Sequence, residues 1–144
     1  MGDNINWDFV KSIFEQHKNQ NFPMEVIHKS RKDSVERAYN EWKLKNTETT
    51  LYDKIFSNIK EDFVIRLNDF PYNLEENVLH YIVWLNPNQT KYNYNSVIDK
   101  NLLNKIKTVL YNKHEIVDMI YFRNKSIHRT IKTINHYHVL VKVG

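Results

Sequence analysis

The chain contains no cysteine, only two glycines and three prolines, and a single alanine among its 144 residues. The absence of cysteine excludes disulfide bonds, catalytic thiolates and zinc sites built from thiolates. No apolar run approaches the ~18–20 residues that a membrane-spanning helix needs, and no basic and then apolar leader opens the chain. We therefore expect a soluble, unprocessed, cytoplasmic protein with no membrane partner. The abundance of asparagine, isoleucine, lysine and tyrosine is typical of an AT-rich genome.

Length and charge set two further bounds. A chain of 144 residues fits one domain with a real hydrophobic core, so we expect residues 1–144 to form a single unit. Lys and Arg number 21 against 17 acidic residues, a formal charge of +4. The basic residues are scattered through the expected helices and form no block. A nucleic-acid partner is permitted by this charge, but it is not indicated.

Periodicity predicts four helices and three strands. Apolar residues recur at helical spacing over residues 7–17, 30–45, 49–63 and 96–113. Asp3 or Asn4 is available to cap the first helix, and Val35, Ala38, Tyr39 and Trp42 form a stripe on the second. The segments "VLHYIVWL", "EIVDMIYFRN" and "INHYHVLVKV" read as strands. This order favours an α+β fold, with a helical N-terminal half packed on a small, mainly antiparallel sheet.

The last predicted strand carries two histidines at alternate positions. His136 and His138 share one face of this strand, whereas Tyr137 and the valines share the other. If His80 on the first predicted strand faces the same way, three imidazoles converge. Buried rings need hydrogen-bond partners, and their ordinary pKa near 6.5 suits a nucleophile, an acid or a base. Three imidazoles are also a candidate site for a divalent metal.

Several motifs together resemble the family named for a fungal N-acetylglucosamine-induced protein, also known as the domain DUF3605. They are Arg31 followed by Tyr39 and Trp42, then "NDFPY", "HYIVW" and the closing "YFRNKSIHRTIKTINHYHVLVK". The resemblance runs from about Trp7 to the C-terminus. Phe70, Tyr121 and Thr130 depart from the family's usual residues, but no polar candidate is lost. The resemblance implies a set of site positions and no particular reaction.

These residues define a predicted site for a phosphorylated or nucleotide small molecule. We predict His136 as the nucleophile, with His138 and His80 as its catalytic partners, because "INHYHVLV" resembles a histidine-triad strand. Ile134 stands where the first histidine of that motif belongs. The predicted ligand-binding ring comprises Arg31, Asn68, Asp69, Tyr72, Arg123, Asn124 and Thr130. Arg31, Arg123 and Asn124 would contact phosphate oxygens.

Three other readings stay open. The chain can be a non-catalytic binding module for a sugar or sugar phosphate, or a purely structural protein. It also resembles metal-dependent phosphodiesterases with a His-hydrophobic-His strand. No tyrosine follows His138 in this sequence, so an upstream residue such as Tyr111 would have to supply their nucleophile. Most simply, Tyr39, Trp42, Trp84 and Phe122 are core aromatics and Asn68-Asp69 is a turn. His17, His28 and His114 are expected to be solvated, and His128 is ambiguous.

Overall fold

Alternating apolar residues build a four-stranded sheet in the order β1-β2-β4-β3. The computed structural model describes residues 5–16, 32–45, 53–56, 60–87, 91–92, 94, 97–123 and 134–144. Every neighbouring pair of strands is antiparallel. The elements are α1 (Trp7–Gln16), α2 (Asp33–Lys45), β1 (Phe63–Leu67), β2 (Val78–Leu85), α4 (Lys100–Lys113), β3 (Ile116–Phe122) and β4 (His136–Val143). This arrangement confirms the predicted α+β class.

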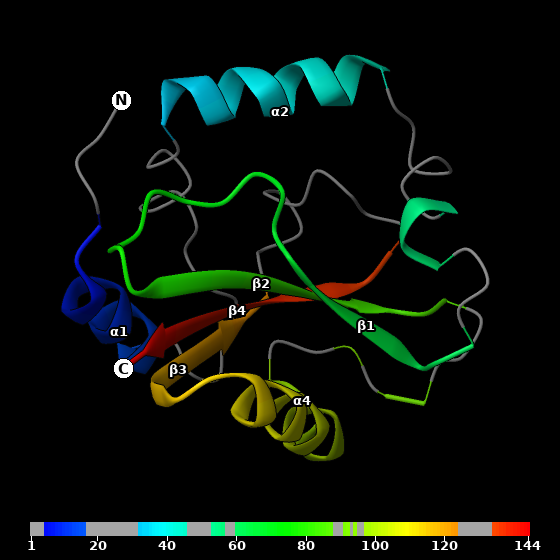
Figure 1. Ribbon diagram of the computed structural model, residues 1–144. Helices are drawn as coiled ribbons and strands as arrows, with labels where there is room; N and C mark the ends of the chain where they lie inside the picture. The colour runs from blue at the N-terminus through cyan, green and yellow to red at the C-terminus, as the bar shows by residue number, and fades with distance from the viewer. Residues whose placement is uncertain are drawn as a thin grey trace.

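Helices cover both faces of the sheet (Figure 1). On one face α4 packs three fully buried residues, Leu102, Ile106 and Leu110, against the side of β4 that carries Tyr137 and the valines. On the other face α1 packs at the β3 end, residues 53–56 form a short helical segment that contributes Ile55 and Phe56, and α2 lies above. The histidines of β2 and β4 belong to this second face, which we call the histidine face.

Polar contacts fix the ends of the helices. Asp99 caps α4, since its side chain accepts hydrogen bonds from the Asn101 and Leu102 amides. Asp3 and Asn4, the predicted caps of α1, lie outside the described residues; instead, the Asn6 side-chain oxygen accepts the Asp8 N–H at 2.8 Å. The side chain of Asp118 on β3 holds α1 in place by accepting hydrogen bonds from the Trp7 indole and the Lys11 ammonium.

Three helix predictions need correction. The fourth helix begins at Lys100 and not near residue 96, since residues 97–99 are not helical. The third helix was expected to reach Phe63, but Phe63 begins β1, and residues 60–62 are not helical. In α2 the predicted stripe is narrower than expected, because Ala38 is exposed and Tyr39 is the buried residue. Tyr39 and Trp42 both contact the Phe70 ring, at centroid distances of 5.0 and 6.1 Å. Among the described residues, no helix has both the length and the apolar character needed to cross a bilayer.

Candidate histidine site

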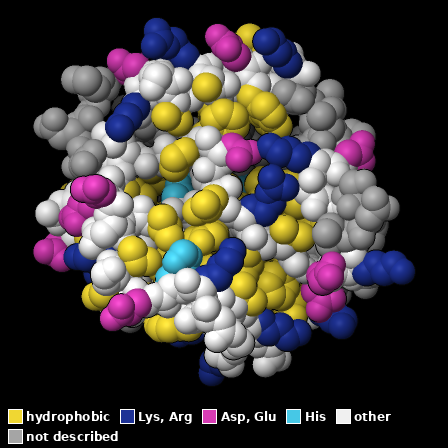
Figure 2. Space-filling model, viewed as in Figure 1, with side chains coloured by type: hydrophobic (Ala, Val, Ile, Leu, Met, Phe, Trp, Pro, Cys, Tyr) yellow, Lys and Arg dark blue, Asp and Glu magenta, His cyan; other side chains and the backbone are white. Residues whose placement is uncertain are grey.

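Three histidines meet at the centre of the histidine face. In the register, His80 lies opposite Leu140, and His138 lies opposite Ile82. His136 lies opposite Trp84 in the same pair of strands. Directly opposed residues of an antiparallel pair point to the same side, so all three rings lie on one face. The rings are 4%, 7% and 5% exposed for His80, His136 and His138. Figure 2 shows histidine atoms between the side chains that lie under α2.

A chain of hydrogen bonds assigns the tautomers of His80 and His138. The Tyr72 backbone N–H donates to His80 Nδ1 at 3.3 Å, so this nitrogen carries a lone pair. The proton of neutral His80 therefore sits on Nε2, which lies 2.8 Å from His138 Nδ1 and donates to it. His138 Nδ1 is then an acceptor, and the proton of neutral His138 is on Nε2. The N–H donor of neutral His138 is thus at Nε2.

His136 has the opposite tautomer. Its Nδ1 lies 2.9 Å from the Ile134 carbonyl oxygen, which can only accept a hydrogen bond. Nδ1 therefore carries the proton of the neutral ring, and Nε2 carries the lone pair. The two rings meet edge to face, with centroids 5.7 Å apart. His136 and His138, two residues apart on β4, thus differ in tautomer. His136 has its lone pair on Nε2, and His138 has its proton on Nε2.

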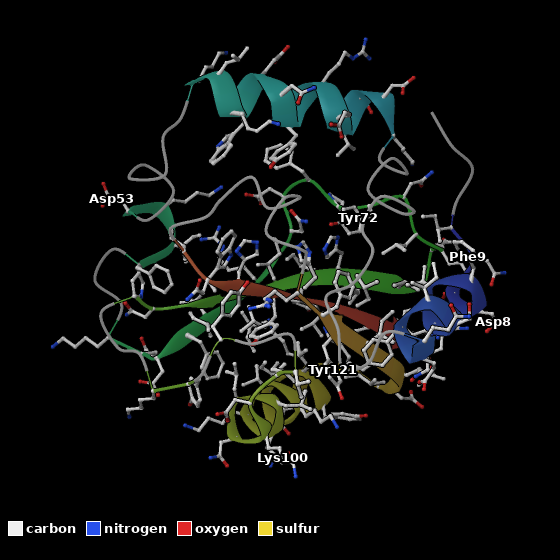
Figure 3. All side chains as sticks on the ribbon, turned by 180° about the vertical axis from the view of Figure 1, so that it is seen from behind. Asp8, Phe9, Asp53, Tyr72, Lys100 and Tyr121 are labelled. Carbon is white, nitrogen blue, oxygen red and sulfur yellow. The ribbon has the colours of Figure 1, made fainter. Side chains whose placement is uncertain are left out.

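Aromatic rings enclose the imidazoles. The Phe122 ring is stacked on His138 at 5.3 Å with an interplanar angle of 7°. Tyr72 contacts His80 at 4.4 Å and His138 at 5.8 Å, and Trp84 contacts His136 at 4.7 Å. Figure 3 shows Tyr72 on the side of the sheet that faces α2. Such contacts lock the orientation of the rings and lower the local dielectric, so the hydrogen bonds between them are strengthened.

The structure brings Asn68 and Tyr72 to the histidines. Asn68 Nδ2 lies 3.4 Å from His80 Nε2 and 3.5 Å from His80 Nδ1. The Asn68 side-chain oxygen accepts the Phe70 N–H at 2.9 Å, which is the turn that the sequence indicates. This turn precedes Pro71 and positions the Tyr72 amide over His80. Asn68 therefore supports the site through this turn.

Other predicted ligand residues lie elsewhere or cannot be placed. Asp69 is exposed and forms an ion pair with Lys54, with 2.6 Å between Oδ2 and Nζ. The Arg123 guanidinium lies over the Tyr94 ring at 4.8 Å and donates to the Tyr94 carbonyl oxygen. Tyr94 packs with the α4 side of the sheet, and its hydroxyl donates to the His136 carbonyl oxygen at 2.9 Å. Arg31, Asn124 and Thr130 lie outside the described residues, as do His17, His28 and His128.

A family model described as "Protein of unknown function (DUF3605)" matches residues 6–142. The chain belongs to the DUF3605 family. The fold of this DUF3605 domain is similar to the crystal structure of HTC1, with a TM-score of 0.63 and 20% sequence identity. That similarity covers 96% of this chain and 85% of that chain, and at this identity it concerns the fold alone. Comparison with curated proteins gives no match. The association with N-acetylglucosamine stays a prediction.

The histidine arrangement in this DUF3605 domain is that of a hydrogen-bonded network. Within the described part of the chain, no group of three or more His, Cys, Asp or Glu side chains is arranged to hold a metal ion. The 2.8 Å contact between His80 and His138 is of hydrogen-bond length. Two nitrogens so close subtend about 86° at a zinc ion with ~2.05 Å bonds, well below the tetrahedral angle. The spacing of His80 and His138 therefore does not suit a tetrahedral zinc ion.

From the sequence, the position of Arg66 is missed and the environment of His114, the C-cap residue of α4, is misjudged. Arg66 lies opposite Ile82 and so projects on the histidine face, but β1 is not among the predicted strands. The alternation in "FVIRL" is the signal that identifies it. His114, expected to be solvated, is instead partly buried on the α4 side, with Nε2 2.7 Å from the Tyr81 hydroxyl. Burial raises the pKa of Tyr81 above its ordinary value.

Proposed function

We propose that this DUF3605 protein is a cytoplasmic enzyme that processes a phosphorylated or nucleotide small molecule, with His136 as its nucleophile. One observation carries the proposal: the hydrogen bond from His136 Nδ1 to the Ile134 carbonyl, which leaves the lone pair on Nε2. A neutral imidazole with a fixed basic nitrogen is a competent nucleophile at neutral pH. Its neighbour His138 offers an N–H donor on the same face.

The proposed reaction has two steps. His136 Nε2 attacks the phosphorus of a phosphoanhydride, forming an N–P bond. The bond between phosphorus and the bridging oxygen breaks, and its electron pair leaves with the departing phosphate. A water oxygen then attacks the same phosphorus, the N–P electron pair returns to Nε2, and the surplus proton of the water goes to solvent. The net change is hydrolysis of one phosphoanhydride bond; a second acceptor in place of water makes it a transfer.

His138 and His80 act on this step through hydrogen bonds. The His138 Nε2–H donates to a phosphoryl oxygen and stabilises its negative charge in the transition state. His80 does not need to touch the ligand, because its bond to His138 Nδ1 is what keeps the proton on His138 Nε2. We therefore assign His80 as a positioning residue, in place of the catalytic role that the sequence suggests.

The experiment is a search for a phosphohistidine. The protein is incubated with ATP and GTP carrying ³²P at the α- or γ-phosphate, quenched in base, and divided between acid and base treatment. We expect a protein-bound label that is lost in acid, kept in base, and absent from His136→Asn. His114→Asn is the matched control, since it removes a histidine from the opposite face. Absence of any acid-labile label, or its persistence in His136→Asn, would overturn the assignment of His136.

A non-catalytic binding module is the second candidate. The observation that favours it is the enclosure of the imidazoles by Tyr72, Trp84 and Phe122, since aromatic rings also provide stacking surfaces for ligands. A thermal-shift screen against nucleotides, amino sugars and sugar phosphates separates the two functions. Ligand-induced stabilisation without label or turnover supports the binding module. Label with turnover supports the enzyme.

A further inference from the structure

We propose that Arg66 and Lys54 form a subsite that binds an anionic group of the ligand at the β1 side of the histidine face. The inference rests on the proposed function in one respect, because it takes the ligand of the histidine site to be anionic. Neither residue belongs to the ring predicted from the sequence, which assigns the positive charges to Arg31 and Arg123. The subsite follows from the register of the sheet.

The register places Arg66 in line with the histidines. Ile82 on β2 lies opposite both Arg66 on β1 and His138 on β4. Arg66 and His138 are thus in one row across the sheet and project from the same face, two strand spacings or about 10 Å apart. An extended arginine side chain covers most of this separation. Ile82, which is buried against Ile55 and Phe56, lies between the arginine and the histidine in this row, so the guanidinium and the imidazoles flank an apolar residue on one face.

Lys54 belongs to the helical segment that the Arg66 side chain contacts, and its ammonium pairs with Asp69. Arg66 Nη1 lies 3.4 Å from the Lys54 carbonyl oxygen, which brings the helical segment 53–56 against β1. Lys54 Nζ forms its ion pair with Asp69, the residue next to Asn68, whose side chain contacts His80. Figure 2 shows basic side chains next to an acidic one on this face. The cluster thus lies between the edge strand and the histidines.

The charges of Arg66, Lys54 and Asp69 suit a site that binds an anion reversibly. Arg66 and Lys54 carry two positive charges and Asp69 one negative charge, a net charge of +1. The side chains of Lys54 and Asp69 are 41% and 53% exposed, so their ion pair is solvated and contributes little stability. A phosphate group competes with the Asp69 carboxylate for Lys54 and gains a charge-assisted contact with the Arg66 guanidinium. Asp69 then acts as a built-in competitor of the ligand.

The test measures binding of inorganic pyrophosphate to the full chain by isothermal titration calorimetry. Arg66→Gln should weaken binding about tenfold or more, since it removes a charge-assisted hydrogen bond to the anion. Arg66→Lys should lose less, because it keeps the charge. Asp69→Asn should strengthen binding about two- to fivefold by releasing Lys54. Lys100→Gln, on the α4 side of the sheet (Figure 3), is the control of equal charge change and should bind as the wild type.

The outcomes separate this subsite from the proposed chemistry. Wild-type protein that binds pyrophosphate through Arg66 but forms no phosphohistidine supports the subsite and discards the nucleophile. The subsite is overturned if the wild type does not bind pyrophosphate, if Arg66→Gln binds as well as Lys100→Gln, or if Asp69→Asn binds more weakly. Circular dichroism of each variant identifies any loss of binding that comes from unfolding. If Arg66→Gln is unfolded, Asp69→Asn still tests the subsite, because unfolding cannot strengthen pyrophosphate binding.

Discussion

His80 and His138 share a hydrogen bond of 2.8 Å between Nε2 and Nδ1, although 58 residues separate them in the chain. His80 and His138 are 4% and 5% exposed, so a lost partner leaves a buried nitrogen without its hydrogen bond. The same bond sets the tautomer of His138. The hydrogen bond between His80 and His138 therefore bears both on the stability of the fold and on the proposed chemistry. Substitutions at the two residues test these effects separately.

His80→Ala should lower the free energy of unfolding by about 2–4 kcal/mol. The substitution leaves the Tyr72 N–H and His138 Nδ1 without their hydrogen bonds and opens a cavity against the Tyr72 ring. Urea unfolding followed by tryptophan fluorescence measures the change. Glu41→Ala on the exposed side of α2 is the control. A loss below about 0.5 kcal/mol for His80→Ala would show that the network contributes no stability.

The ring nitrogens of His136 and His138 should give opposite ¹⁵N spectra. We expect the proton on Nδ1 in His136 and on Nε2 in His138 when both are neutral, because Ile134 O accepts from the first and His80 donates to the second. Long-range ¹H–¹⁵N correlation spectra distinguish the two tautomers directly. In His80→Phe only His138 should change. Identical tautomers in the wild type would contradict the assigned chain.

Stability should fall in acid through Asp118. Burial works to raise the pKa of its carboxyl, but hydrogen bonds from Lys11, Trp7 and the Met119 amide, with the Lys11 charge, bring it below its ordinary 3.8. Because this pKa is lowered, the contribution of Asp118 to the free energy of unfolding is complete above about pH 4. It is lost as the pH falls through the pKa of Asp118 in the folded state. Asp118→Asn should flatten the dependence of the unfolding free energy on pH in this range. An unchanged slope would count against the tie between α1 and β3, and Lys11→Met should give an intermediate slope.

Tyr81 should be among the last tyrosines to ionise in base. Burial raises the pKa of its phenol above the ordinary 10.0. The folded state holds this proton more tightly than the unfolded state. The contribution of Tyr81 to the free energy of unfolding is therefore complete below about pH 10 and declines as the pH rises further. Phenolate absorbance in an alkaline titration should show a late component that disappears in Tyr81→Phe. If the titration curve of the variant keeps that component, another tyrosine is responsible.

The cap of α4 offers a prediction that does not involve the site. Asp99→Ala removes the acceptor of two amide hydrogen bonds and should cost about 1 kcal/mol in unfolding free energy. Asp99→Ser restores an acceptor and should recover most of the loss. Thermal unfolding followed by circular dichroism measures both variants. Equal stability of the alanine and serine variants would exclude a capping role.

Much of the fold follows from local patterns. The alternation of "HYHVLVKV" assigns the faces of β4 correctly, because the period of two is unambiguous where one face meets α4. β1 is missed because five residues beginning at Phe63 follow directly on a helical pattern. Helix length in that region depends on tertiary packing against Ile82 and Trp84, which the sequence does not display.

The sequence predicts which side chains face the site, but not how they are hydrogen-bonded. Alternation identifies the facing of His136 and His138, and the turn at Asn68 is visible in the sequence. The order of hydrogen bonds is not visible, since it depends on which backbone groups reach each ring: the Tyr72 amide for His80 and the Ile134 carbonyl for His136. Arg66 is missed with β1, because a residue's facing is only defined once its strand is known.

β4 carries the imidazoles on one side and Tyr137, Val139 and Val141 on the other. A slip of one residue against its neighbours would exchange these two sets, pushing imidazoles into the layer under α4 and aliphatic side chains toward Tyr72. The eight residues of this strand consequently determine both the packing under α4 and the placement of the imidazoles, and mispairing during folding would destroy the core and the proposed site together. Loss of chemistry in a poorly folded preparation would then report strand alignment, independently of any damage to the imidazoles themselves.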